Sequence, residues 1–124
     1  MKNYFLILLA MLLLSSCYND KIQELYPSTP TTTCDTNTVT YSATILPIIK
    51  ASCSISGCHD ATTVAGGYNY STYAGLYVNV QNNRLMGALN HTTGYFAMPL
   101  NAPALTSCQI SQFTAWINKG APNN

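Results

Sequence analysis

Charged side chains are scarce in this chain of 124 residues, in which five Lys and Arg and four Asp and Glu together make up 7% of the sequence. The formal net charge is only +1. The sequence therefore has no basic patch that would attract nucleic acid and no acidic run that would attract a cationic partner. We expect the docking of any partner to depend only weakly on salt.

Long hydrophobic runs are also missing. The longest apolar run, FLILLAMLLL, is half the length of about 20 residues that a membrane-spanning helix needs. Lys2 precedes it, and the small residues of LSSC, which ends at Cys17, follow it. This pattern predicts a lipoprotein signal peptide over residues 1–16 with lipidation at Cys17. The alternative is a plain signal peptide in which Cys17 is an incidental thiol.

Two further segments follow the predicted signal. The stretch YNDKIQELYPSTPTTT has no helical or strand period, so residues 17–33 are expected to form the lipidated cysteine and a flexible tether. Residues 34–124 are expected to form the folded domain. The expected location is the bacterial cell envelope, as an exported lipoprotein anchored at a membrane that faces the periplasm or the cell exterior.

Strand patterns and internal repeats are absent as well, and the apolar spacing favours helices. The first is expected over residues 41–51, with Pro47 either in its first turn or at a kink. The second begins near Ser71 as its cap, and a short third helix covers residues 82–89. The predicted fold class is all-α, a small bundle of three to four helices.

The last helix has the clearest signals. Thr106 and Gln109 form a predicted capping box, and Leu105 is placed to contact Ile110 across the cap. Gly120, followed closely by proline, predicts the helix end.

The run CSISGCHD carries the strongest chemical signal, because two cysteines followed directly by histidine are how a polypeptide holds haem c. The usual spacing is C-x-x-C-H, whereas four residues separate Cys53 from Cys58 here. In such sites two thiols add across the haem vinyl groups to form thioethers. The adjacent His59 would be the proximal iron ligand.

Met98, in GYFAMPLNAPAL, is the predicted distal iron ligand. Pro99 biases the residue before it toward extended backbone, so Met98 is expected in an irregular segment that can lie across a haem face. Haem iron held by His and Met has a raised potential and no open position. The alternatives are that His91 is the ligand, or that Met98 only fills a gap in the core.

Other interpretations of Cys53 and Cys58 remain open. Four cysteines follow Cys17, and without haem they permit three disulfide pairings. If Cys53 and Cys58 carry haem, the remaining pairing joins Cys34 to Cys108. A zinc site or a cysteine nucleophile is disfavoured, because free thiolates are rare in an oxidising compartment and a nucleophile normally meets its base through the fold.

A helix leads to Cys53, Cys58 and His59, and it is followed by a helix that begins STYAGL, a Met-Pro loop and a final segment FTAWINKGAPNN. The order of these features resembles that of bacterial single-haem c-type cytochrome domains. The likeness is to the class I-like domains of planctomycetes and Bacteroidetes, and it extends from Cys34 to the end of the chain. The resemblance implies one covalent haem c, with thioethers at both cysteines and axial ligation by His59 and Met98. The four-residue spacer departs from the family pattern.

The expected function is therefore a membrane-anchored electron carrier rather than an enzyme. Its expected partners are the membrane, through the lipid anchor, and a redox protein that is itself membrane-bound; no nucleic acid is expected. Two alternatives are a haem-free interaction or structural lipoprotein stapled by disulfides, and a haem peroxidase or ligand sensor with an open iron position.

Overall fold

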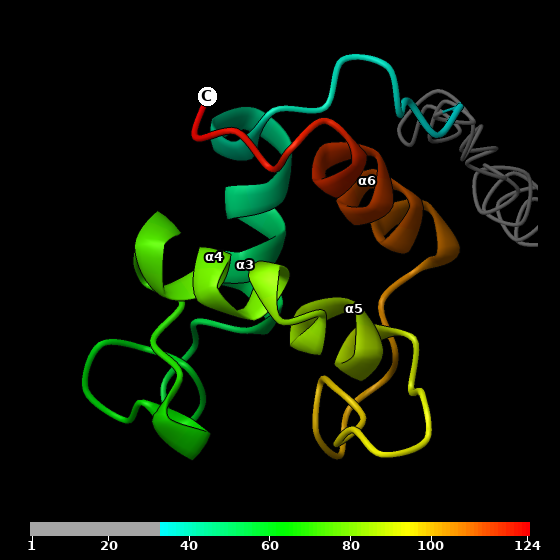
Figure 1. Cartoon of the computed structure of the whole chain (residues 1–124). Helices are drawn as coiled ribbons and strands as arrows, with labels where there is room; N and C mark the ends of the chain where they lie inside the picture. Colours follow the sequence, from blue (N-terminus) through cyan, green and yellow to red (C-terminus); the bar gives the residue numbers. More distant parts are fainter. Residues whose placement is uncertain (1–32) are drawn as a thin grey trace, which may run out of the picture. The chain divides into compact units, whose positions relative to one another are not determined.

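The structure, a computed structural model, describes residues 33–124; the predicted signal peptide, Cys17 and the tether up to residue 32 lie outside this part of the chain. Helices hold 46% of the described residues, and none of these residues is in a strand (Figure 1). The predicted all-α class is confirmed for the described part of the chain.

The first helical segment is continuous but changes its hydrogen-bond pattern. It begins as a π-helix, η1 (Tyr41–Ile45), and continues as an α-helix, α3 (Leu46–Ser52). The side chain of Thr40 caps the start by accepting a hydrogen bond from the Ala43 N–H at 3.2 Å. Pro47 lies in the first turn of α3, at the point where the hydrogen-bond pattern changes from π to α. The helix predicted over 41–51 is confirmed.

Helix α4 (Tyr73–Gln81) follows a short 3-10 turn, η2 (Ala65–Gly67). Its cap is Thr72, whose hydroxyl accepts from the Gly75 N–H at 3.2 Å. The prediction that Ser71 caps this helix is wrong. The Ser71 hydroxyl instead lies 3.1 Å from the Ser54 hydroxyl, a contact made with the turn after α3.

Helix α5 (Arg84–Leu89) begins two residues later than predicted, after the turn at Asn82 and Asn83. The Asn82 side chain accepts from the Arg84 N–H at 3.0 Å. Asn83 has φ of 58°, which is left-handed and stops α4 from continuing into α5.

Helix α6 (Ser107–Asn118) begins and ends as predicted. Thr106 and Gln109 form the capping box in both directions. Gly120 has φ of 87°, its N–H donates to Ile117, and the Ala121 N–H donates to Trp116, which together make a Schellman end. Local signals were sufficient here because the partners are at most five residues apart.

The core lies where η1, α3 and α6 meet α4. The fully buried apolar side chains come from all of these segments: Ile45, Ile49, Leu76, Phe113 and Trp116. The C-terminal tail closes this assembly, since the Asn124 carbonyl accepts from the Ser42 N–H at 2.7 Å and the Tyr73 hydroxyl donates to the Ala121 carbonyl at 2.7 Å. Burial of this apolar surface provides most of the stability of the helices.

Cys34 and Cys108 form a disulfide, with Cα atoms 5.5 Å apart and 74 positions between them in sequence. The predicted pairing is confirmed. The bridge fastens the segment before η1 to the first turn of α6.

Two irregular segments lie on the same side of α4 and α5 in Figure 1, one before α4 in green and one between α5 and α6 in yellow to orange. Both contribute residues to a single cavity. The helices thus place the cysteine motif and the Met98 segment beside the same cavity.

Candidate haem-binding site

Cys53 directly follows α3 and opens a tight loop that ends at His59. The Cys53 N–H donates to the Ile49 carbonyl at 2.9 Å, and the His59 N–H donates to the Cys53 carbonyl at 3.0 Å. The four spacer residues turn inside this loop, where the Cys58 N–H donates to the Ile55 carbonyl at 3.0 Å. The loop closure therefore brings His59 back to Cys53 in spite of the wide spacing.

Gly57 makes this turn possible. Its φ is +84°, a value that residues with a side chain rarely adopt, and a Cβ atom there would meet nothing within 4 Å. Backbone conformation, and not space, is thus the reason for glycine at this position. Gly57 thus supplies the backbone freedom with which the four-residue spacer turns.

The segment after the motif is held by the Asp60 carboxylate. This group accepts hydrogen bonds from the N–H groups of Thr62 and Thr63, both at 2.7 Å, and from the Thr63 hydroxyl at 2.9 Å. These bonds, led by the Thr63 N–H, lower the pKa of Asp60. The Thr63 hydroxyl also accepts from the Gly57 N–H at 3.1 Å, so the turn braces the cysteine loop.

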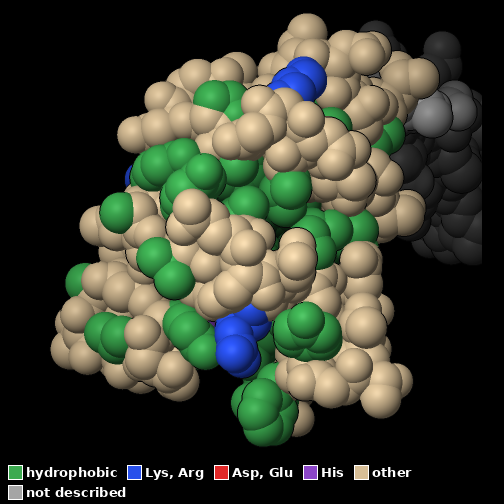
Figure 2. Space-filling model, in the orientation of Figure 1, with side chains coloured by type: hydrophobic (Ala, Val, Ile, Leu, Met, Phe, Trp, Pro, Cys, Tyr) green, Lys and Arg blue, Asp and Glu red, His purple; other side chains and the backbone are tan. Residues whose placement is uncertain are grey.

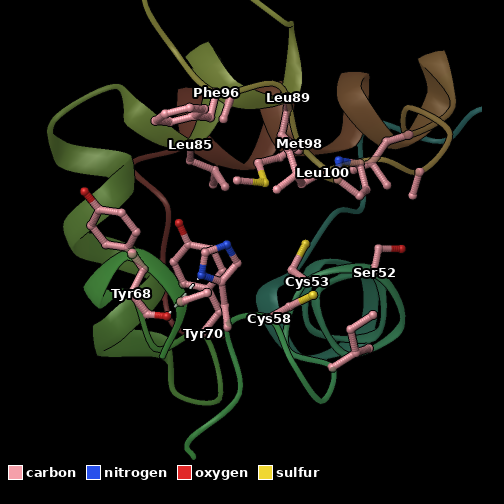
Figure 3. A pocket seen from close by; sticks show the side chains of 18 of the residues that line it. Ser52, Cys53, Cys58, Tyr68, Tyr70, Leu85, Leu89, Phe96, Met98 and Leu100 are labelled. Atoms are coloured by element: carbon pink, nitrogen blue, oxygen red, sulfur yellow. Dashed lines mark hydrogen bonds between the residues drawn. The ribbon is translucent and has the colours of Figure 1, made fainter. Parts of the chain in front are cut away.

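His59 is buried, and one of its ring nitrogens is bound to protein. Its Nδ1 lies 3.1 Å from the Tyr68 carbonyl, the contact drawn as a dashed line in Figure 3. Because a carbonyl only accepts, Nδ1 must carry the proton, which leaves the Nε2 lone pair free. The imidazole also packs against Tyr70, with ring centroids 4.5 Å apart. Metal-binding histidines are commonly held in this way, by a hydrogen bond from the other ring nitrogen to a carbonyl.

His59 faces a cavity of about 770 Å³, which falls in the range of about 300 to 1,000 Å³ typical of cofactor sites. Figure 3 shows Cys53 and Cys58 on one side of the open space and Leu85, Leu89 and Met98 on the other. The lining is mainly apolar. Cys53, Cys58, His59 and Met98, predicted from separate parts of the sequence, all line it.

The cavity mouth is formed in part by the segment that carries Met98. Met98 is half-buried, while Phe96 is 80% and Leu100 62% exposed although both line the cavity. Large apolar side chains left this exposed around a cavity are typical of a binding site.

Cys53 and Cys58 are free thiols, in contrast to Cys34 and Cys108. Burial, with a smaller contribution from Cys58, raises the pKa of Cys53 to about 11. Cys53 is therefore protonated near neutral pH, which is the opposite of what an activated nucleophile requires. The haem-free alternative with two disulfides requires a bond between Cys53 and Cys58, and this bond is not formed here.

Arg84, which sequence reasoning missed, is the one charged residue among those that line the cavity. Its guanidinium lies 5.4 Å from the centroid of the Tyr68 ring, a cation-π contact at the start of α5. Figure 2 shows basic and hydrophobic side chains close together on this face, with no Asp or Glu in view. No local motif marks Arg84, because its place depends on how α5 meets the segment before α4.

His91, the alternative distal ligand, and Met86, the other methionine of the described residues, both lie outside the cavity lining. His91 is exposed, and its Nε2 is 3.2 Å from the Met98 carbonyl. Met86 packs against the core. Of the tyrosines near the motif, Tyr68 and Tyr70 line the cavity, whereas Tyr73 makes edge-to-face contacts with Tyr41 and Trp116 in the core.

Comparisons with family models, with curated proteins and with solved structures gave no match to this chain. Within residues 33–124, no helix has the length and apolar character needed to cross a membrane. The same residues contain no group of three or more His, Cys, Asp or Glu side chains placed to share a metal ion. The cavity lining instead includes one imidazole, that of His59, and one thioether, that of Met98.

Proposed function

We propose that this protein is a membrane-anchored electron carrier with one covalently attached haem c. Cys53 and Cys58 would form the thioethers, and His59 and Met98 would be the axial iron ligands. The observation that carries the proposal is the mainly apolar cavity that has both free thiols on one side and Met98 on the other, with His59 also in its lining.

The donor set fits this group in chemical detail. Thioether formation adds each S–H across a vinyl group, so it needs thiols rather than a disulfide, and both cysteines are free. The Tyr68 carbonyl fixes the His59 proton on Nδ1 and leaves Nε2 to bind iron. Arg84 supplies a positive charge for an anionic substituent of the ligand.

A haem with His and Met axial ligands supplies one-electron chemistry at a raised potential and without an open coordination position. The residues of the chain then have three tasks. The cysteines would fix the group, the apolar lining contributed by α5 would keep water from it, and Met98 would bind the iron, which a peroxidase or ligand sensor leaves open at one position.

Cys17 would anchor this domain to a membrane of the cell envelope, where a membrane-bound redox protein is the expected partner. Cys17 lies outside the described residues, so this part of the proposal rests on the sequence pattern. Only two carboxylates, Asp35 and Asp60, belong to residues 33–124, which supports docking that is nearly independent of salt.

The direct test is expression of the full chain in a bacterial host together with a cytochrome c maturation system. The dithionite-reduced absorption spectrum should show the sharp bands of low-spin haem. The matched control is the Cys53→Ser/Cys58→Ser double variant, which keeps the Cys34–Cys108 disulfide and should lack covalent haem. A wild-type chain that folds but shows no haem bands would overturn the proposal.

A further inference from the structure

The backbone of Met98 is fastened to α5 and the turn after it. The Met98 N–H donates to the Ala88 carbonyl at 3.1 Å, and the Met98 carbonyl lies 3.2 Å from Nε2 of His91. Because a carbonyl only accepts, His91 must donate through Nε2–H. Both polar backbone groups of Met98 are therefore bound by residues near the end of α5.

His91 is itself held in a strained but well-bonded turn. Its φ is 52°, in the left-handed region, and its N–H donates to the same Ala88 carbonyl at 3.3 Å. The next residue, Thr92, donates its N–H to the Gly87 carbonyl at 2.9 Å. This turn directs the His91 side chain to the Met98 carbonyl, and His91 itself is not among the residues that line the cavity.

A second contact fixes the same segment. The Tyr95 ring lies directly on the backbone of Gly87, so a Cβ atom at Gly87 would be only 2.6 Å from Cδ2 of Tyr95. The Tyr95 N–H also donates to the Thr92 carbonyl at 3.1 Å. Tyr95 and Met98 both line the cavity, so the segment is held against α5 at two points.

We propose that His91 is a positioning residue that holds Met98 at the cavity through its backbone carbonyl, and that it is not itself an iron ligand. The assignment of Met98 as the ligand rests on the proposed function. The bond to His91 is formed by the polypeptide alone, so the methionine is oriented before anything binds. Such preorganisation lowers the entropy lost on ligation.

Two substitutions separate the hydrogen bond from the backbone turn. Asn tolerates a left-handed φ, but its amide ends where Nδ1 of the imidazole lies and falls short of the Met98 carbonyl. The Gln side chain is one bond longer than that of Asn, so its amide can approach the position that Nε2 of His91 occupies. His91→Asn should therefore break the contact, and His91→Gln should restore part of it. Asn90→Ala, on the same turn, is the matched control.

The first measurement is amide hydrogen exchange at Met98 in the full chain, both without haem and after haem attachment. We expect His91→Asn to lower the protection of the Met98 amide by roughly 3- to 10-fold, the range of one net hydrogen bond. His91→Gln should recover part of this loss, and Asn90→Ala should leave it unchanged. In the reduced haem protein, His91→Asn should also raise carbon monoxide affinity by roughly the same factor.

Three results would overturn the positioning role. One is that the exchange protection of the Met98 amide is unchanged in His91→Asn. Another is that Asn90→Ala lowers this protection as much as His91→Asn does. The third is a haem protein whose spectrum changes in His91→Asn but not when Met98 is replaced, since His91 would then be the ligand. Failure of the wild-type chain to acquire haem refutes the proposed function instead, and the exchange data on the haem-free chain still decide the role of His91.

Discussion

At the scale of single residues, the state of His59 follows from the groups around it. Its Nδ1–H donates a hydrogen bond to the Tyr68 carbonyl at 3.1 Å, and Tyr70 packs on the ring. Nε2 is therefore the nitrogen available to iron. Met98, the proposed second ligand, is held through its backbone, so its side chain is the only part that would have to order on binding.

Replacing Met98 with alanine should open the iron of the haem protein to carbon monoxide, because no other cavity-lining residue is a methionine or a second histidine. Met86→Ala is the matched control, since Met86 lies against the core and outside the cavity lining. The measurement is the reduced absorption spectrum with and without carbon monoxide. Equal responses of the two variants would remove Met98 from the ligand set.

Residue types and spacing were enough to single out Cys53, Cys58, His59 and Met98 as candidates, and all four line one cavity. They were not enough for residues whose role depends on packing. Asn79 is completely buried on α4 although the apolar spacing of this helix gave no indication of it. Its amide has no hydrogen-bond partner among the described residues, and we have no physical account of it.

At the scale of secondary-structure elements, α5 links the core to the site. Leu85 and Leu89 are buried on one side of this short helix, and Ala88 and Gly87 bind the following turn through their carbonyls. Gly87 lies within the helix, where alanine would normally be more favourable by about 1 kcal/mol. Glycine is required here because the Tyr95 ring occupies the space of a Cβ atom.

Gly87→Ala should therefore displace Tyr95, and with it the Met98 segment, in spite of its higher helix propensity. We expect lower stability in the single variant, measured by urea unfolding of the full chain. The effect should be smaller in a Tyr95→Ala background, where the ring is gone. The contact between Tyr95 and Gly87 would be unimportant if Gly87→Ala changed the free energy of unfolding equally with and without the Tyr95 ring. It would be equally unimportant if Gly87→Ala stabilised the protein by about 1 kcal/mol in both backgrounds.

Element boundaries were predictable where their signals are local. The capping box at Thr106 and the glycine end at Gly120 involve neighbours in sequence and were both correct. The cap of α4 was placed one residue early, because the Ser71 hydroxyl contacts Ser54, a residue 17 positions away. The His91 contact was unforeseen for the same reason, since it depends on the chain reversing after α5.

At the scale of the whole molecule, long-range connections hold a chain that has a small core. The Cys34–Cys108 disulfide joins residues 74 positions apart, and the C-terminal Asn124 binds the start of η1. This pairing could be predicted from the sequence only on the premise that Cys53 and Cys58 carry haem and form no disulfide. How the helices meet around the cavity could not be read from the sequence, since it depends on packing between distant segments.

Replacing both bridging cysteines, Cys34→Ser/Cys108→Ser, should lower the free energy of unfolding by about 4 kcal/mol, because the loop they close is long. Urea unfolding of the haem protein measures this change. Wild-type protein treated with a reductant should show a similar loss, and thioethers at Cys53 and Cys58 would be unaffected by it. A variant as stable as the wild type would show that the bridge contributes nothing to stability.

The central claim is that Cys53 and Cys58 hold a haem covalently, and the intact mass of the denatured chain tests it most directly. After coexpression with the maturation system, the account predicts a mass gain of one haem that survives denaturation and reduction. The Cys53→Ser/Cys58→Ser variant should show no gain. A folded wild-type chain with no haem adduct, and with Cys53 and Cys58 joined to each other in a disulfide, would contradict the account.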